Sequence, residues 1–589
     1  MLLLLPFFSS LVLVLGFALP RPGCASTLPR TSCAISAYGS GLQGYDTGGG
    51  ACRYTMRYGD IGSRWAYSTL ATELANQSAV ASLPPSCPQD TNTYNVGPTQ
   101  SEDCLYAVVY VPQSPAPSSG WPIFVWLHGG SFVSGSAAAP GLDGSALASR
   151  GNMIVVVLQY RLGVLGNLPP SQAPSDADPN LALKDVILAL EAIHTFASYI
   201  GGDATKVTIG GQSSGASLIR GDFSPSVPVI CAESSALWGA PASSGLFRAA
   251  ILQSDPMSYG FAPSSTTSTL QAGFYASTQL ANCTTLACLQ SVPVADIISA
   301  QDDFTSTAFY VYEGLPLPET IRPTYGTATL PSDPTSLLYS SPSTLTHPPS
   351  TLPLLLSTTA NEAGSIIQEI FPSPILIQPE TTNTTFFTYL TSLLGSARAD
   401  ALFNSSYYVL PNITGYGANN DAFRETFERL VTDGAWRSPN RDAGRQWAKS
   451  GGKVWIGEWR QGITYPDNQV ENGYCLGKVC HEVGLNVESR KDAVLTIGRQ
   501  DDIYPTFGTA PHANSSVTSF ESQILKYWSA FITNLDPNPS LSSTKSWKPF
   551  TSSSTSADVF ALGGDGQVTP GPPTGFWGGQ VQYDWQLYG

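Results

Sequence analysis

Short apolar runs, separated by polar or glycine-rich stretches, divide the first half of the chain. Residues 121–128 (WPIFVWLH) and 153–160 (MIVVVLQY) are almost wholly apolar, which is typical of strands buried on both faces. Residues 181–199 carry apolar side chains at helical spacing instead, and a β-branched run follows at 206–209. This order of strands and helix predicts an α/β protein with a mainly parallel central sheet and helical crossovers.

The second half of the chain continues the same pattern less regularly. Three apolar runs predict further strands, at 248–253, 353–357 and 453–457. Residues 261–350 and 371–430 predict mixed helix and loop. Because no internal repeat and no break in composition interrupts the chain, we expect a single domain over residues 26–589.

The N-terminus carries an apolar run of a different kind. Residues 2–19 are almost all apolar, and prolines and small residues follow them. We interpret residues 1–25 as a secretory signal peptide, with a retained anchor as the alternative because the usual basic residues are missing. The net charge of -15, with only 28 Lys plus Arg, argues against nucleic acid or an anionic membrane as a partner.

The cysteines and glycosylation sequons agree with secretion. In an oxidising compartment the ten cysteines predict disulfide bonds, and no Cys-x-x-Cys pair suggests zinc or redox chemistry, so we expect neither metal nor cofactor. Six Asn-x-Ser/Thr sequons, several of which would arise by chance in this Ser- and Thr-rich chain, make a secreted glycoprotein the expectation. They lie at Asn76, Asn282, Asn383, Asn404, Asn412 and Asn514.

The most informative motif is Gly211-Gln212-Ser213-Ser214-Gly215, directly after the β-branched run at 206–209. This Gly-x-Ser-x-Gly pattern is typical of a tight strand-to-helix turn that exposes a nucleophilic serine. With 55 glycines in 589 residues and many serines, about 0.6 matches are expected by chance, so the motif needs its structural context.

A serine hydroxyl needs a base to remove its proton and an acid to orient that base. The candidate bases are the five histidines. His481 is the best of them because it lies in a loop after the strand at 453–457, although an ordinary solvated histidine remains the alternative. The others are His128, before a Gly-Gly loop, His194, in the predicted helix, His347, in a proline-rich join, and His512, beside a sequon.

Several landmarks, in order along the chain, resemble the type-B carboxylesterase and cholinesterase family of α/β-hydrolases. They cover about residues 50–550. The landmarks are SEDCLY (101–106), WLHGGSF (126–132), YRLG (160–163), GGDATKVTIGGQSSGA (201–216), GLFRAAILQS (245–254), STTANEAGS (357–365), VTDGAWRSP (431–439), VCHE (479–482) and YWSAFITNLDPN (527–538). The resemblance implies the α/β-hydrolase fold, with helices on both faces of the sheet.

The resemblance also implies a catalytic triad of Ser213 as nucleophile, Glu362 as acid and His481 as base, in the chain order of α/β-hydrolases. The amides that would bind the oxyanion belong to Gly130, Ser131 and Ser214. Some positions depart from the family: Ser131 replaces a glycine, Asp255 replaces a glycine, Gln159 replaces an asparagine, and Gly484 does not supply the acidic residue often found after the histidine.

Two kinds of pairing follow from the family comparison and from counting cysteines. Family-like ion pairs would join Arg64 to Glu102 and Arg161 to Asp185, with separate solvated charges as the alternative. If cleavage removes Cys24 and an insertion accounts for Cys231, eight cysteines remain. We expect these to pair as Cys33–Cys52, Cys87–Cys104, Cys283–Cys288 and Cys475–Cys480, the first and last of which rest on sequence proximity alone.

Two segments are specific to this chain. Residues 221–235 interrupt the helix that should follow the nucleophile, and their prolines make them a poor helix, so we expect a surface insertion or an unspliced intron. Residues 88–103, where lipases of the family have a lid, contain only Tyr94 and Val96 as sizeable non-proline apolar side chains. We therefore expect activity on soluble esters without activation at a lipid surface.

These observations favour a secreted serine hydrolase that cleaves carboxylic esters through an acyl-enzyme on Ser213. A non-catalytic relative used for recognition is an alternative from another class, although it would not need a complete triad. A lipase acting on water-insoluble esters is a further alternative, disfavoured by the polar loop at 88–103. We expect a small-molecule ester as the partner and no stable insertion into a membrane.

Overall fold

The computed structural model describes most of the chain, with gaps between the described segments. These segments are residues 33–37, 40–71, 80–91, 99–139, 141–220, 245–277, 280–311, 319–340, 352–364, 366, 387–388, 390–391, 394–408, 422–462, 478–480, 501–510, 514–539 and 545–587. The predicted signal peptide, residues 1–25, and the proposed insertion at 221–235 lie outside them.

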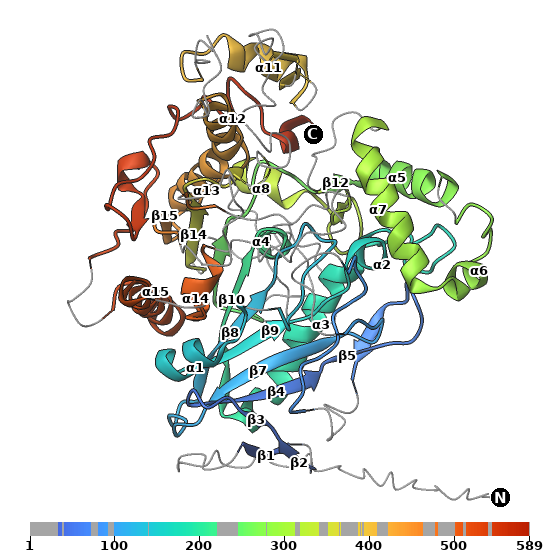
Figure 1. The fold of residues 1–589 in the computed structure, drawn as a ribbon, viewed down its shortest axis with the longest axis vertical. Helices are drawn as coiled ribbons and strands as arrows, with labels where there is room; N and C mark the ends of the chain where they lie inside the picture. The colour runs from blue at the N-terminus through green and yellow to red at the C-terminus, as the bar shows by residue number, and fades with distance from the viewer. Residues whose placement is uncertain are drawn as a thin grey trace, which may run out of the picture.

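A ten-stranded sheet forms the centre of the described structure (Figure 1). Its strand order is β16-β15-β14-β11-β10-β8-β9-β7-β4-β3. The pairs from β16 to β9 are parallel, and those from β9 to β3 are antiparallel. The strands are β3 (Tyr45–Asp46), β4 (Ala51–Arg57), β7 (Tyr106–Pro112), β8 (Trp121–Leu127), β9 (Ile154–Leu158), β10 (Gly202–Gln212), β11 (Ala249–Gln253), β14 (Leu354–Thr359), β15 (Val454–Trp459) and β16 (Phe560–Leu562).

Three two-stranded sheets lie outside this centre. They pair β1 (Ala34–Ala37) with β2 (Ser40–Gln43), β5 (Gly59–Ile61) with β6 (Ser68–Leu70), and β12 (Ala262–Pro263) with β13 (Thr324–Tyr325). The α-helices are α1 (Ser145–Gly151), α2 (Gly163–Asn167), α3 (Leu181–Phe196), α4 (Ser214–Arg220), α5 (Ser264–Ser277), α6 (Leu286–Ser291), α7 (Val294–Val311), α8 (Pro334–Ser340), α11 (Ser396–Phe403), α12 (Ala422–Thr432), α13 (Ser438–Lys449), α14 (Ile503–Phe507) and α15 (Ser515–Asn534).

Helices cover both faces of the sheet because alternate residues of each buried strand point to opposite sides. In β8, Ile123 and Val125 belong to the core that contains α3, whereas Phe124 and Trp126 belong to the core that contains α15. Every residue of β8 is buried, which explains why its sequence is a continuous apolar run.

Two groups of helices lie beyond the sheet (Figure 1). Helices α5, α6 and α7 lie together on the right of the view and share an apolar core with α2. Helices α11, α12 and α13 lie towards the top. Between α12 and α13, Asp433–Arg437 forms one turn of π-helix, η5, a feature that is frequent at functional sites.

The predicted strands and helix are confirmed, with small shifts at their ends. The run at 121–128 forms β8, the run at 153–160 forms β9, and the helical pattern at 181–199 forms α3 followed by a 3₁₀ turn at Ala197–Ile200. The strand expected at 206–209 is the end of the longer β10. The runs at 248–253, 353–357 and 453–457 form β11, β14 and β15.

Three expected disulfides are confirmed, Cys33–Cys52, Cys87–Cys104 and Cys283–Cys288. Cys480 is also disulfide-bonded, while Cys475 lies outside the described residues. Both expected ion pairs form: Arg64 contacts Glu102 at 2.6 Å, and the buried Arg161 contacts Asp185 at 2.7 Å.

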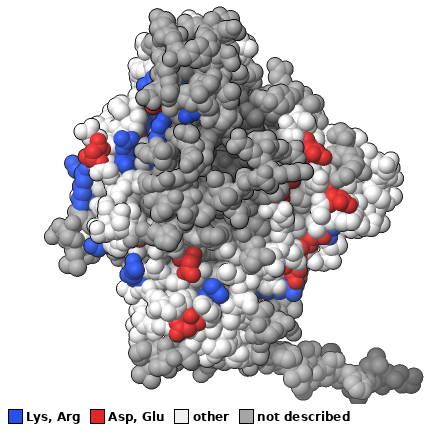
Figure 2. Space-filling model, viewed as in Figure 1, with Lys and Arg blue, Asp and Glu red and all other residues white. Residues whose placement is uncertain are grey.

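On the face shown in Figure 2, the basic side chains of the described residues lie mainly on the left, and acidic side chains predominate on the right. Within the described segments, no helix is both long enough and apolar enough to cross a membrane.

Candidate active site

Ser213 lies in the tight turn between β10 and α4, as its motif predicted. Its φ of 55° is in the left-handed region, where a non-glycine residue is strained. The Ser213 N–H donates to the carbonyl of Gln253 at 3.0 Å, which fastens the turn to the end of the neighbouring strand β11. The serine therefore stands at the carboxyl end of a parallel sheet, where open α/β sheets bind ligands.

The two motif glycines are needed because backbone passes close to both. A Cβ atom on Gly211 would lie 2.7 Å from the carbonyl carbon of Gly215. A Cβ atom on Gly215 would lie 2.4 Å from the carbonyl oxygen of Leu127, at the end of β8. The Gly-x-Ser-x-Gly match could arise by chance in the sequence alone. Its position in a tight, closely packed strand-to-helix turn supplies the structural context that the motif needs.

The loop after β8 brings a second strained segment to the serine. Gly130, Ser131 and Phe132 all have positive φ angles, of 126°, 52° and 64°. A Cβ atom on Gly129 would lie 3.0 Å from the Ser213 Cβ atom, so this loop passes directly beside the nucleophile turn. Consecutive residues held in rare conformations are a mark of functional loops.

Glu362 lies in a turn that directly follows β14, two strands from Ser213 in the sheet. The side chain is fully buried, and its Oε1 atom accepts a hydrogen bond of 2.6 Å from the backbone N–H of Thr359. Burial raises the pKa of Glu362 to about 8, the Thr359 N–H opposes this shift, and the nearby Asp502 carboxylate adds to it. The site thus disfavours a negative charge on Glu362 unless a cation is close to it.

His481 lies outside the described residues, but the three residues before it are described. The N–H of Asn361, next to Glu362, donates to the carbonyl of Val479 at 3.0 Å, and Asn361 pairs with Cys480 as a parallel bridge. The N–H of Cys480 donates to Asp501 at 3.1 Å. The segment leading to His481 is therefore held against the turn that carries Glu362.

Two of the remaining histidines are described, and each has a structural contact. His128 is buried and stacked on Tyr160 with ring centroids 4.5 Å apart, and burial lowers its pKa to about 4. His194 contacts the carbonyl of Leu246 at 3.0 Å. His347 and His512 lie outside the described residues.

Asp501 and Asp502, both of which are buried, carry no recognisable signal in the sequence. Asp502 accepts hydrogen bonds from the side-chain amides of Gln212 at 3.0 Å and Gln253 at 3.2 Å. Burial raises the pKa of Asp502 to about 6, against the effect of these hydrogen bonds. The resemblance implies an acidic residue shortly after His481, but Asp501 and Asp502 lie 20 and 21 positions after it, so the spacing gave no signal.

The departure at Asp255 is explained by a buried ion pair. Asp255 accepts hydrogen bonds from Arg220 Nε at 2.9 Å and from the Ser217 hydroxyl at 2.8 Å. Both partners lie on α4, the helix that begins at Ser214. The aspartate at the end of β11 therefore fastens this helix where the family usually has glycine.

Other expected features of the site are described only in part. Tyr94 and Val96 of the predicted lid loop lie outside the described residues. In the segments that the structure does describe, no group of three or more His, Cys, Asp or Glu side chains is arranged to hold a metal ion.

Comparison with known proteins places this geometry in context. A sequence model of the carboxylesterase family matches residues 61–569. Para-nitrobenzyl esterase of Bacillus subtilis is 40% identical over 172 residues, which cover 28% of this chain and 32% of that protein. Human carboxylesterase 3 is 38% identical over 184 residues, covering 30% of this chain and 29% of that protein. The matched segments span only about a third of these relatives.

Solved structures share the fold over nearly the whole chain. A thermophilic PNB esterase covers 88% of this chain and 94% of its own, with a TM-score of 0.64 and 22% identity. A second PNB esterase structure has a TM-score of 0.63 at the same identity and coverage. The expected α/β-hydrolase fold is therefore confirmed.

Proposed function

The chain belongs to the carboxylesterase family, and from this premise we propose that it is a secreted hydrolase that cleaves carboxylic esters through an acyl-enzyme on Ser213. The observation that carries the proposal is the strained turn of Ser213, which lies beside the loop at Gly129 and within two strands of a buried carboxyl group. They correspond to the nucleophile, the oxyanion loop and the acid that acyl transfer by a serine requires in addition to a base.

The proposed base is His481, and the proposed acid is Glu362. The support for this pairing is the bridge between Asn361 and Cys480, because each of these residues directly precedes one member of the pair. A carboxyl group whose pKa is raised to about 8 by burial gains much from a neighbouring cation. Glu362 would therefore stabilise the imidazolium that forms when His481 accepts a proton.

The reaction then proceeds in two balanced halves. The Ser213 oxygen attacks the ester carbonyl carbon while His481 accepts the hydroxyl proton. His481 returns that proton to the departing alcohol, which leaves an acyl group on Ser213. A water molecule then attacks the acyl carbon, gives a proton to His481 and releases the carboxylic acid as Ser213 regains its hydrogen.

The negative oxygen of each tetrahedral intermediate needs donors that are already in place. We assign this role to the backbone amides of Gly130, Ser131 and Ser214, and removal of one such donor typically costs about 3 to 4 kcal/mol. The positive φ angles at Gly130 and Ser131 support the assignment, because they mark backbone held in an unusual direction beside Ser213.

The names of the relatives support the substrate class. They include a para-nitrobenzyl esterase, a carboxylesterase and, in Anas platyrhynchos, a medium-chain fatty acyl-CoA hydrolase that is 38% identical over 186 residues, covering 30% of each chain. All three names describe release of a carboxylic acyl group. The three disulfides among the described cysteines support an oxidising, extracellular location.

The decisive experiment compares the wild type with Ser213→Ala on p-nitrophenyl butyrate. We expect the variant to lose about 10⁴-fold or more in kcat, because the nucleophile is absent. Ser268→Ala, a matched change at an exposed serine of α5, should leave kcat unchanged. Retained activity in Ser213→Ala would refute the proposal, and an inactive wild type across acyl lengths would favour a non-catalytic relative.

A further inference from the structure

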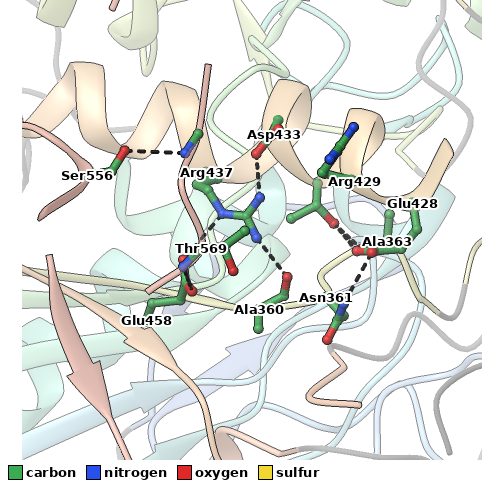
Figure 3. A network of polar contacts seen from close by, with 12 residues as sticks. Ala360, Asn361, Ala363, Glu428, Arg429, Asp433, Arg437, Glu458, Ser556 and Thr569 are labelled. Carbon is green, nitrogen blue, oxygen red and sulfur yellow. Dashed lines mark hydrogen bonds and ion pairs between the residues drawn. The ribbon is translucent and has the colours of Figure 1, made fainter. Parts of the chain in front are cut away.

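A second buried carboxylate, Glu428 on α12, holds the turn around Glu362 from both sides (Figure 3). Its Oε2 atom accepts a hydrogen bond of 3.2 Å from the side-chain amide of Asn361. Its Oε1 atom accepts one of 2.6 Å from the Thr432 hydroxyl, which in turn accepts one of 3.0 Å from the backbone N–H of Ala363. One carboxylate thus anchors the residue before Glu362 and the residue after it.

Asn361 extends this anchoring to the segment that precedes His481. The Asn361 side-chain oxygen accepts from the N–H of Val479 at 3.3 Å, while its side-chain nitrogen donates to Glu428. The amide can serve both partners in only one orientation, with its oxygen towards Val479 and its nitrogen towards the carboxylate. Glu428 therefore fixes the orientation in which Asn361 joins the two segments.

The π-helix at Asp433–Arg437 completes the support. Arg437, a buried residue of this turn, donates from Nη2 to the carbonyl of Ala360 at 2.7 Å and contacts Glu458 at 3.3 Å (Figure 3). Helix α12 and the π-helix together hold the backbone of Ala360 and Ala363 and the side chain of Asn361.

Burial of Glu428 needs compensation, because a carboxylate loses favourable hydration inside a protein. Burial raises its pKa, while the hydrogen bond from Thr432 and the positive charge of Arg437 lower it. Glu425, one turn earlier on the same helix, is 60% exposed and pairs only loosely with Lys478, at 3.6 Å. The chain thus keeps one glutamate of this helix on the surface and places the other against the acid-bearing turn.

We propose that Glu428 is a positioning residue that sets the separation of the acid and the base in this esterase. The inference rests on the proposed roles of Glu362 and His481. Glu428 does not contact the reacting atoms; it acts through Asn361 and Thr432. Errors of about 1 Å in the placement of catalytic groups can lower a rate by about 10²-fold, so loss of this anchor should reduce catalysis without blocking substrate binding.

The test uses Glu428→Gln, which keeps the shape of the side chain but replaces one carboxylate oxygen with an NH₂ group. Either the Asn361 amide or the Thr432 hydroxyl then loses its acceptor. We expect kcat on p-nitrophenyl butyrate to fall about 10- to 100-fold, with KM changed less than about twofold. Glu191→Gln, at a glutamate of α3, is the matched control and should match the wild type. Titration with an organophosphate gives the number of folded sites, so that kcat is expressed per competent molecule.

A double-mutant cycle tests whether Glu428 acts through its neighbour. Asn361→Ala should also lower kcat, and adding Glu428→Gln to it should cost little more, because the linking amide is already absent. Thr432→Val removes the other link at nearly constant volume and serves if Glu428→Gln folds poorly. A wild-type kcat per titrated site in the folded variants would overturn the inference. If the wild type is inactive on the ester, or if Ser213→Ala remains active, the proposed function is overturned instead.

Discussion

Gly215 offers a sharp test of the packing around the nucleophile, because two physical effects predict opposite outcomes there. Gly215 is the second residue of α4. Helix propensity alone predicts that Gly215→Ala stabilises the protein by about 1 kcal/mol. The close approach of neighbouring backbone predicts the reverse.

The structure gives the size of the opposing effect. The added Cβ atom would lie 2.4 Å from the carbonyl oxygen of Leu127 and 2.5 Å from that of His128, whereas ordinary contacts begin at 3.4 Å. The helix and the end of β8 must therefore separate by about 1 Å, since neither neighbour is a flexible side chain. Residues 128–132, which carry the proposed oxyanion donors, begin at this point.

We expect Gly215→Ala to lose about 10²-fold in kcat and about 1 to 3 kcal/mol in the free energy of unfolding. Ester hydrolysis and chemical unfolding measure the two quantities. Gly62→Ala, where no atom lies within 4 Å of the added carbon, is the control and should be nearly silent in both. A fully active and more stable Gly215→Ala would show that the close packing inferred here is wrong.

Two further predictions concern buried charges. Arg220→Met should destabilise the protein by about 3 to 5 kcal/mol, because Asp255 is left charged and buried without its partner, and adding Asp255→Gly should recover part of that loss in a chemical unfolding experiment. Burial raises the pKa of Glu362 to about 8 in the folded chain while no imidazolium faces it, against an ordinary value of 4.5 when unfolded, so its contribution to stability is present at low pH and is lost as pH rises across this window. Glu362→Gln should therefore gain stability relative to the wild type by about 1.4 kcal/mol per pH unit between about pH 5 and 8, and a pH-independent difference in unfolding would contradict this.

The parallel part of the sheet was predictable because its strands are buried on both faces. The strands β8 and β9 read as unbroken apolar runs, and burial of every residue explains why. The antiparallel strands β4 and β7 were not predicted, although β7 (YAVVYVP) carries a similar apolar signal. The edge strand β16 has only three residues, which is too short to show a pattern.

The candidate site was predictable only where the chemistry is local. The turn at Ser213 and the glycines beside it follow from one short motif, and Glu362 and His481 from the resemblance. The roles of Asp502 and Glu428 depend on contacts between distant parts of the chain, with Gln253 and Asn361 respectively. The π-helix at Asp433–Arg437 changes the helical repeat by only a fraction of a turn, so the spacing of apolar residues in the sequence did not predict it.

The disulfide at Cys480 has a consequence for how the protein should be produced. Cys480 adjoins the histidine assigned as base, whereas the other described disulfides pair cysteines 19, 17 and 5 positions apart elsewhere in the chain. A reducing host cell would remove this covalent restraint beside the base together with the disulfides of the core. Specific activity, in addition to yield, should then report whether a recombinant preparation has been properly oxidised.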